Sequence, residues 1–237
     1  GLGSLSRPRA RQVPAAPALI MFTSADHRFM DAALALAEAQ LGRTAPNPAV
    51  GCIIVRDGVI AGWGATADGG RPHAERQALD QAGPLACTGR AYVTLEPCAF
   101  HGQTPPCASA LIEAGVDTVM IACLDEHPKV AGRGVALLRD AGIAVETGLR
   151  NREAARLYAG FFHRLRTGQP LVYLDANPAR YDAMLTDAAM HAPAAELDRL
   201  GAAGMNRVCV APGSPLALHL VEAGLVHTPE AAAHTAR

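Results

Sequence analysis

This chain has little charge and no excess of either sign. Lysine and arginine total 21 and aspartate and glutamate total 22 among 237 residues, so the formal net charge is −1. A surface that binds nucleic acid or an anionic membrane normally needs a positive excess. No apolar run approaches the ~20 residues that span a bilayer. We therefore expect neither nucleic acid nor a membrane as a partner.

Two kinds of framework are also missing. The chain has no G-x-G-x-x-G motif and no P-loop, so no motif indicates a cradle for nucleotide phosphates. Its six cysteines are too sparse for a disulfide scaffold in a chain of this length. Cys52 and Cys123 lie in apolar runs, which is typical of small buried side chains. Only Cys98 and Cys107 stand among prolines, glycines and polar residues, where a loop can direct sulfur toward a metal.

One group of residues has the composition of a catalytic metal site. His73 is followed two positions later by Glu75, and Pro97-Cys98 precedes Cys107. One imidazole and two thiolates leave a fourth zinc position for water, whereas structural zinc sites are usually closed by four protein ligands. Zinc deaminases carry H-x-E followed by P-C-x-x-C. The first half fits, but here eight residues separate the two cysteines.

Hydrolytic deamination is the chemistry that this group permits. Zinc lowers the pKa of its bound water from about 15.7 to about 7. Glu75, which binds no metal in this scheme, can take the proton of that water and pass it to a leaving amine. Glu96 is expected to have a structural role, ordering the loop around Cys98. A purely structural zinc site, or a chance grouping of these residues, is the alternative.

The apolar pattern predicts helices that alternate with strands. Asp57-Gly58 between two apolar runs predicts a hairpin, so the first two strands should be antiparallel. Ser24 is expected to cap the first helix and Gly42 to end it. Helices between mostly apolar strands favour an α/β sandwich with a mixed sheet, and residues 177–193 show no clean pattern. The expected helices are residues 24–41, 73–82, 107–114, 134–141, 151–166, 194–203 and 215–223, and the expected strands are residues 50–55, 59–63, 90–95, 116–123, 143–146, 170–176 and 207–211.

We divide the chain into three predicted parts. Residues 1–20 contain three arginines, three prolines and no acid, and we expect a disordered tail and a cytoplasmic protein. Residues 21–150 contain the whole candidate metal site. Residues 151–237 are few for an independent α/β domain.

Five short segments match one known family. They are Pro46-Asn47-Pro48-Ala49-Val50-Gly51-Cys52, Pro72-His73-Ala74-Glu75, Tyr92-Val93-Thr94-Leu95-Glu96-Pro97-Cys98, Thr104-Pro105-Pro106-Cys107 and Val130-Ala131-Gly132-Arg133-Gly134. Through them, residues 25 to about 150 resemble the deaminase domain of the bifunctional deaminase/reductase of riboflavin biosynthesis. The second zinc cysteine of that family lies nine positions after the first, as it does here.

The resemblance implies a fold, a metal and a substrate. The fold is a three-layer cytidine-deaminase-like sandwich, and zinc is bound by His73, Cys98 and Cys107. Glu75 is the proton shuttle. The implied substrate is a diaminopyrimidinone that bears a phosphoribosylamine, and deamination converts it to the matching uracil.

The expected substrate contacts match the family less closely than the zinc site does. They are Asn47, Thr66, Phe100, Gln103, Asp125 and His127. Asn47 and Asp125 agree with the family. Histidines are usual where this chain has Thr66 and Phe100, and a lysine near the phosphate is usual at Gln103. Asparagine is usual at His127. Such charge-assisted contacts are worth roughly 1.5–3 kcal/mol each, so the substrate is either that of the family or a changed one without the phosphate.

The C-terminal part resembles the reductase domain of the same family only in fragments, at residues 168–174 and 200–227. The nucleotide-binding portion between them has no counterpart. We interpret residues 151–237 as a truncated, degenerate reductase-like domain and expect no NADPH-dependent reduction. We also expect a homodimer or a higher homo-oligomer.

Two other interpretations stay open. One is a diverged paralogue that deaminates another pyrimidine, a pterin or a purine in specialised metabolism. The other is a non-catalytic scaffold that zinc stabilises. The presence of Glu75 disfavours the scaffold, because a purely structural site needs no acid beside the metal.

Overall fold

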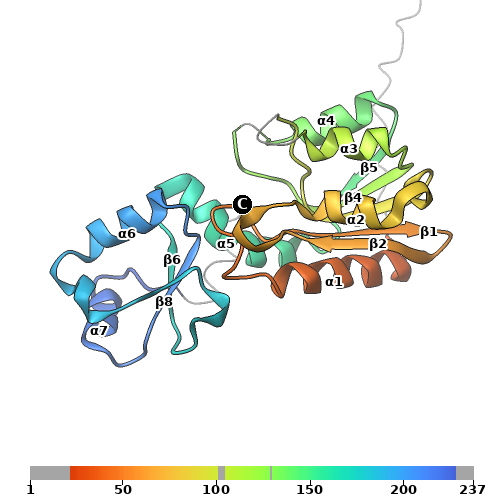
Figure 1. Cartoon of the computed structure of the whole chain (residues 1–237). Helices are drawn as coiled ribbons and strands as arrows, with labels where there is room; N and C mark the ends of the chain where they lie inside the picture. Colours follow the sequence, from red (N-terminus) through yellow and green to blue (C-terminus); the bar gives the residue numbers. More distant parts are fainter. Residues whose placement is uncertain (1–21, 101–104, 129, 228–237) are drawn as a thin grey trace, which may run out of the picture.

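Five strands form a mixed sheet in the first lobe of the molecule. The computed structural model describes residues 22–100, 105–128 and 130–227 (Figure 1). The sheet has the order β2-β1-β3-β4-β5, in which β1 pairs antiparallel with both β2 and β3, and the remaining pairs are parallel. The predicted hairpin is therefore confirmed. The strands are β1 (Gly51–Arg56), β2 (Val59–Ala65), β3 (Arg90–Leu95), β4 (Thr118–Cys123) and β5 (Ala144–Thr147).

Helices cover both faces of this sheet. Two of them lie together on one face and three on the other, which makes three layers (Figure 1). The first face carries α1 (Ser24–Glu38) and α5 (Asn151–Thr167), and the second carries α2 (Ala74–Ala82), α3 (Cys107–Glu113) and α4 (Arg133–Asp140). The α/β sandwich expected from the sequence is confirmed.

Burial of the central strands on both faces explains their composition. Every residue of β4 is buried, and so are the first five residues of β1. A strand covered by helices on both sides reads as a continuous apolar run rather than an alternating one. Glycine permits one especially close approach, because a Cβ at Gly51 would collide with the carbonyl oxygen of Ala33 in α1.

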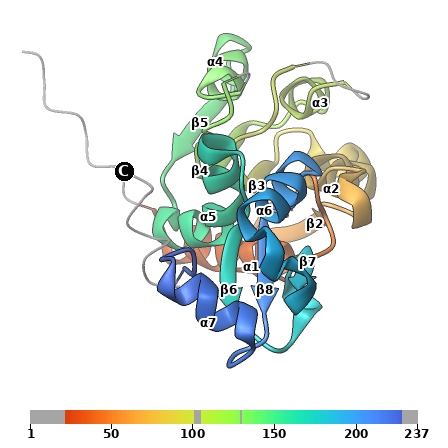
Figure 2. The same cartoon turned by 90° about the vertical axis from the view of Figure 1, so that its left-hand side faces the viewer.

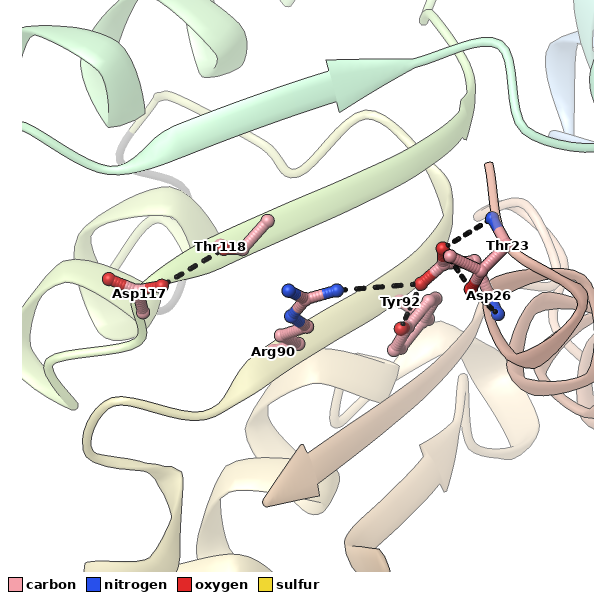
Figure 3. Close-up of polar contacts among 6 residues, drawn as sticks. All are labelled: Thr23, Asp26, Arg90, Tyr92, Asp117 and Thr118. Atoms are coloured by element: carbon pink, nitrogen blue, oxygen red, sulfur yellow. Dashed lines mark hydrogen bonds and ion pairs between the residues drawn. The ribbon is translucent and has the colours of Figure 1, made fainter. Parts of the chain in front are cut away.

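A polar cluster fixes the start of α1 to the edge of the core (Figure 3). Thr23 is the N-cap: its hydroxyl accepts a hydrogen bond from the backbone N–H of Asp26, whose carboxylate in turn accepts from the backbone N–H of Thr23 at 2.8 Å. The hydroxyl of Tyr92 donates to Asp26 at 2.7 Å. The cap predicted at Ser24 was thus one residue late, because the Thr23 hydroxyl closes the capping box. The helix ends at Glu38, before the predicted Gly42.

The second lobe contains a smaller parallel sheet (Figure 2). Its strands are β6 (Leu171–Leu174), β7 (Ala183–Leu185) and β8 (Arg207–Val210), in the order β6-β8-β7. Helices α6 (Pro193–Ala202) and α7 (Pro215–Glu222) pack with the sheet around a separate apolar core. Strand β7 lies within the segment that showed no pattern. The described residues also form the 3₁₀ helices η1 (Asp68–Gly70), η2 (Gly83–Ala86), η3 (Pro178–Arg180) and η4 (Asp187–His191).

Helix α5 connects the two lobes and packs in the core of the first. Leu157, Tyr158 and Phe161 belong to the main apolar cluster, and the Tyr158 hydroxyl lies 2.5 Å from the Thr94 hydroxyl of β3. The division predicted at residue 150 falls directly before this helix, and the tail predicted for residues 1–20 lies outside the described residues. None of the described helices is long and apolar enough to cross a membrane.

Candidate active site

The first turn of α2 carries His73 and Glu75 because α2 lies very close to β2. His73 is the N-cap of the helix, and Glu75 lies in its first turn. A Cβ at Gly64 would lie 2.5 Å from the carbonyl oxygen of Ala74, so only glycine permits this approach. A Cβ at Gly62 would likewise collide with the carbonyl oxygen of Ala78 in the middle of α2. Because these two positions are glycine, α2 can pack close to β2, and this packing places His73 and Glu75 next to the sheet.

The two cysteines come from the loop after β3 and from the start of α3. Cys98 follows β3, and Cys107 is the first residue of α3. The backbone N–H of Cys107 donates to the Sγ atom of Cys98 at 3.2 Å, and the N–H of Ala108 donates to the carbonyl oxygen of Cys98 at 3.1 Å. These two bonds hold Cys98 against the start of α3, with both sulfur atoms close to His73.

The three side chains fit a tetrahedral zinc ion. The Nδ1 atom of His73 lies 3.3 Å from the Sγ of Cys107 and 3.9 Å from the Sγ of Cys98. One ligand atom from each of the three residues lies within 4.8 Å of the others. Zinc–nitrogen and zinc–sulfur bonds at the tetrahedral angle separate such atoms by about 3.6 Å. The donor set and its spacing are those of a three-ligand zinc site.

Hydrogen bonding at this site favours a thiolate. Hydrogen bonds from Cys107 and His73 lower the pKa of the Cys98 thiol to about 4 against the opposing effect of burial. The hydrogen bond to Cys98 and burial raise the pKa of Cys107, so the two sulfur atoms share a proton unequally. The thiolate is the form of cysteine that binds metal ions.

Glu75 is a buried acid beside this group. Only 4% of the residue is exposed. Burial, followed by the negative charge of Cys98, raises the pKa of Glu75 to about 7. A carboxyl group in this range can both accept and donate a proton near neutrality. Its position thus satisfies the electrostatic requirement for a proton shuttle.

A cavity of about 300 Å³ lies over the group. Five of the six predicted substrate contacts line it, namely Asn47, Thr66, Phe100, Asp125 and His127. The sixth, Gln103, lies outside the described residues. The rings of Phe100 and His127 are stacked, with centroids 6.0 Å apart. Burial raises the pKa of Asp125 to about 6.

Glu96 organises one wall of the cavity. Its carboxylate accepts four backbone N–H groups, from Asp125, Gly132, Gly134 and Val135, at 2.9–3.3 Å. Two of these donors lie in the first turn of α4, whose positive end favours a carboxylate. We expected Glu96 to order the loop around Cys98. The segment bonded to it is instead residues 125–135, which carries Asp125 and His127.

Helix α5 contributes three lining residues that the sequence did not predict. They are Phe161, Arg164 and Leu165 of α5. Their amphipathic spacing predicted a helix with a buried face. Nothing in that spacing indicated that the face borders the site, because a helical period does not specify which element covers it.

Comparison with known proteins decides the family. A model of the cytidine and deoxycytidylate deaminase zinc-binding region matches residues 23–123. The diaminohydroxyphosphoribosylamino-pyrimidine deaminase of Buchnera aphidicola (from Acyrthosiphon pisum) is 46% identical over 142 residues, which is 60% of this chain and 97% of that protein. This chain belongs to the riboflavin-biosynthesis deaminase family.

Other members of the riboflavin-biosynthesis deaminase family are longer than the matched region. Riboflavin biosynthesis protein RibD of Haemophilus influenzae is 50% identical over 156 residues, and that of Escherichia coli is 51% identical over 149 residues. These alignments cover 66% and 63% of this chain but only 42% and 41% of the relatives. The chain therefore matches about two-fifths of their length.

Solved structures extend the likeness beyond the matched sequence. Acinetobacter baumannii RibD superposes with a TM-score of 0.74 at 29% identity, over 85% of this chain and 84% of that one. A Thermotoga maritima deaminase/reductase superposes at 24% identity with a TM-score of 0.73, which shows a shared fold. The superposed 85% of the chain is longer than the first lobe, so the structural similarity includes part of the second lobe.

Proposed function

We propose that this protein hydrolytically deaminates the diaminohydroxyphosphoribosylaminopyrimidine of riboflavin biosynthesis. One observation carries the proposal: the buried carboxyl of Glu75 lies beside the grouped ligand atoms of His73, Cys98 and Cys107, at the base of a cavity. The name of the Buchnera relative, matched over nearly its whole length, supports this choice of substrate.

The residues divide the reaction between metal binding and proton transfer. His73, Cys98 and Cys107 hold zinc. When bound, zinc supplies a water molecule that ionises near neutral pH. Glu75 takes one proton from the attacking water and passes it to the amino nitrogen, and the second proton of the water ends on the ring nitrogen. A carbon–oxygen bond forms, the carbon–nitrogen bond breaks and ammonia leaves. The product carries a carbonyl where the substrate carried the amine.

The cavity walls orient the ring. Its volume of about 300 Å³ is at the small end of ligand pockets, which suits a substrate with a single heterocyclic ring. The side-chain amide of Asn47 donates to the carbonyl oxygen of Gly70 at 2.8 Å, which fixes its direction. Asp125 is held by the backbone N–H of His127 at 2.7 Å. We assign ring recognition to Asn47, Thr66 and Asp125, and a stacking face to Phe100 and His127.

The stacked pair of Phe100 and His127 favours a second candidate. An aromatic wall can accept another aminated pyrimidine, pterin or purine, so a diverged deaminase with a different substrate is the alternative. NADPH-dependent reduction is not part of the proposal. A homodimer or higher homo-oligomer, and a cytoplasmic location, stay predictions.

Ammonia release tests the proposal. The zinc-loaded protein is assayed with the phosphoribosyl substrate, its dephosphorylated form, and a panel of aminopyrimidines, aminopterins and aminopurines. Turnover of the phosphoribosyl substrate, abolished by a chelator and restored by zinc, is the expected result. Preferred turnover of another heterocycle would select the second candidate. If the zinc-loaded protein turns over no compound of the panel, the interpretation as a non-catalytic scaffold is favoured.

A further inference from the structure

Arg164 lines the cavity and brings a positive charge to its wall. It is the one arginine or lysine among the described residues that line the cavity. In the described part of the chain, no carboxylate lies within ion-pair distance of it, whereas seven other arginines form such pairs. Arg164 is half-buried, and a guanidinium in such a place is costly to keep without a direct acidic partner.

Two hydrogen bonds aim Arg164 and leave donors for a ligand. Its Nε–H donates to the side-chain oxygen of Asn206 at 2.7 Å, and Nη2 donates to the carbonyl oxygen of Pro46 at 3.1 Å. A guanidinium has five N–H groups, so three have no partner among the described residues. Burial lowers the pKa of Arg164, and the charge of Asp182 opposes this only in part.

The second lobe holds these partners in place. Asn206 is buried, and its backbone N–H donates to Asp182 at 2.6 Å. Gly160 of α5 has no Cβ, which allows the backbone of Asn206 to approach the helix. A Cβ at Gly204 would collide with Pro46, so this lobe also touches the loop that carries Asn47. The guanidinium is therefore fixed between the lobes before any ligand binds.

We propose that Arg164 binds the phosphate of the substrate, so that the second lobe completes the deaminase pocket. Guanidinium and phosphate pair through two parallel hydrogen bonds, which adds direction to charge attraction. The inference rests on the proposed function and sharpens it. The sequence suggested loss of the phosphate because a lysine is replaced at Gln103. Arg164 supplies a cation to the cavity from α5.

Steady-state ammonia release with Arg164→Gln tests this assignment. For the phosphoribosyl substrate, KM rises roughly tenfold to a hundredfold, the loss expected for a hydrogen bond to a charged group. For the dephosphorylated substrate, KM stays the same. The kcat values change little, because Arg164 does not touch the reacting atoms. Arg166→Gln is the matched control: it removes a cation two residues along the same helix that pairs with Glu126, outside the cavity lining, and it leaves both KM values unchanged.

A binding experiment separates this inference from the proposed function. Calorimetry measures ribose 5-phosphate, with ribose as the uncharged comparison, against the zinc-loaded wild type and Arg164→Gln. The wild type binds ribose 5-phosphate at least tenfold more tightly than the variant. If ribose 5-phosphate binds both equally, the inference is wrong even where deamination is intact. If the wild type deaminates neither substrate but shows this difference, the proposed function is wrong, and only the contact between Arg164 and a phosphate group stands.

Arg164→Lys guards against a folding artefact, since Arg164→Gln also loses bonds to Asn206 and Pro46. Lysine keeps the charge without the planar fork, so KM for the phosphoribosyl substrate rises less than in Arg164→Gln. Thermal unfolding is recorded for every variant. An equal rise of KM for the phosphorylated and dephosphorylated substrates in both variants would assign Arg164 a structural role and overturn the inference.

Discussion

The Nδ1 atom of His73 lies 3.3 Å from the Sγ atom of Cys107, although 34 positions separate the two residues in the sequence. This proximity depends on the close packing of α2 against the glycines of β2 and on the start of α3. We predict that Cys107→Ala reduces bound zinc from one equivalent to about a tenth or less, because two protein ligands do not hold the ion in competition with a chelator.

Metal analysis of the purified variant, after dialysis against a weak chelator, gives the answer. Cys87→Ala is the control, because Cys87 is an exposed thiol that does not belong to the His73, Cys98 and Cys107 group. It should retain a full equivalent of zinc. Full zinc retention in Cys107→Ala would show that this cysteine is not a ligand.

A second prediction concerns Glu96 and the wall that it supports. In Glu96→Gln an amide N–H₂ replaces one carboxylate oxygen and faces backbone N–H groups, so accepted hydrogen bonds are lost. We expect the free energy of unfolding to fall by roughly 1.5–3 kcal/mol, since the acceptor is buried and charged. We also expect a higher KM, because the segment that carries Asp125 and His127 loosens.

Glu126→Gln provides the comparison for Glu96. Glu126 is exposed and forms a surface ion pair with Arg166 at 3.0 Å, so its loss should cost at most about 1 kcal/mol. Urea unfolding of both variants measures the difference. Equal stability of the two variants would mean that the four backbone hydrogen bonds of Glu96 make no net contribution to the free energy of unfolding.

The metal site was predictable from sequence because its chemistry is local. His73, Cys98 and Cys107 each stand at a helix start or just after a strand, and their residue types are rare in such loops. Glu75 follows from its position two residues after His73. Most helices and strands were also predicted within a few residues, since long apolar periods determine them.

The features that the sequence did not predict depend on tertiary packing. Strand β7 has three residues, too few for a period, and exists through its parallel pairing with β8. The α5 wall was missed because a helical pattern shows that Phe161 and Leu165 are covered but not by what. Nothing in the sequence singled out Arg164, because its hydrogen bonds to Asn206 and Pro46 arise only from the tertiary fold.

A third prediction concerns the pH dependence of stability. The rings of His163 and His227 are 5.0 Å apart, and burial, His227 and Arg166 lower the pKa of His163 from 6.5 to about 4. Between these pH values the unfolded chain binds a proton at this residue that the folded chain does not. Stability is therefore complete above about pH 6.5 and falls as the pH drops toward 4.

Urea unfolding at pH 7.5 and pH 5 measures this effect. The loss of unfolding free energy between the two values should be smaller in His163→Gln than in the wild type. His219→Gln, which changes an exposed histidine on α7, should retain the wild-type loss. An undiminished loss in His163→Gln would rule out His163 as a source of the pH dependence.

The most direct test of the central claim is ammonia release from the phosphoribosyl substrate by the wild type and by Glu75→Gln, with bound zinc measured in the same samples. Glutamine keeps the shape of Glu75 and removes its titratable proton. We predict that Glu75→Gln retains zinc and loses roughly 10²–10⁴-fold in kcat, the usual contribution of general acid–base catalysis. A zinc-loaded variant with kcat close to that of the wild type would contradict the account, as would a zinc-loaded wild type that releases no ammonia.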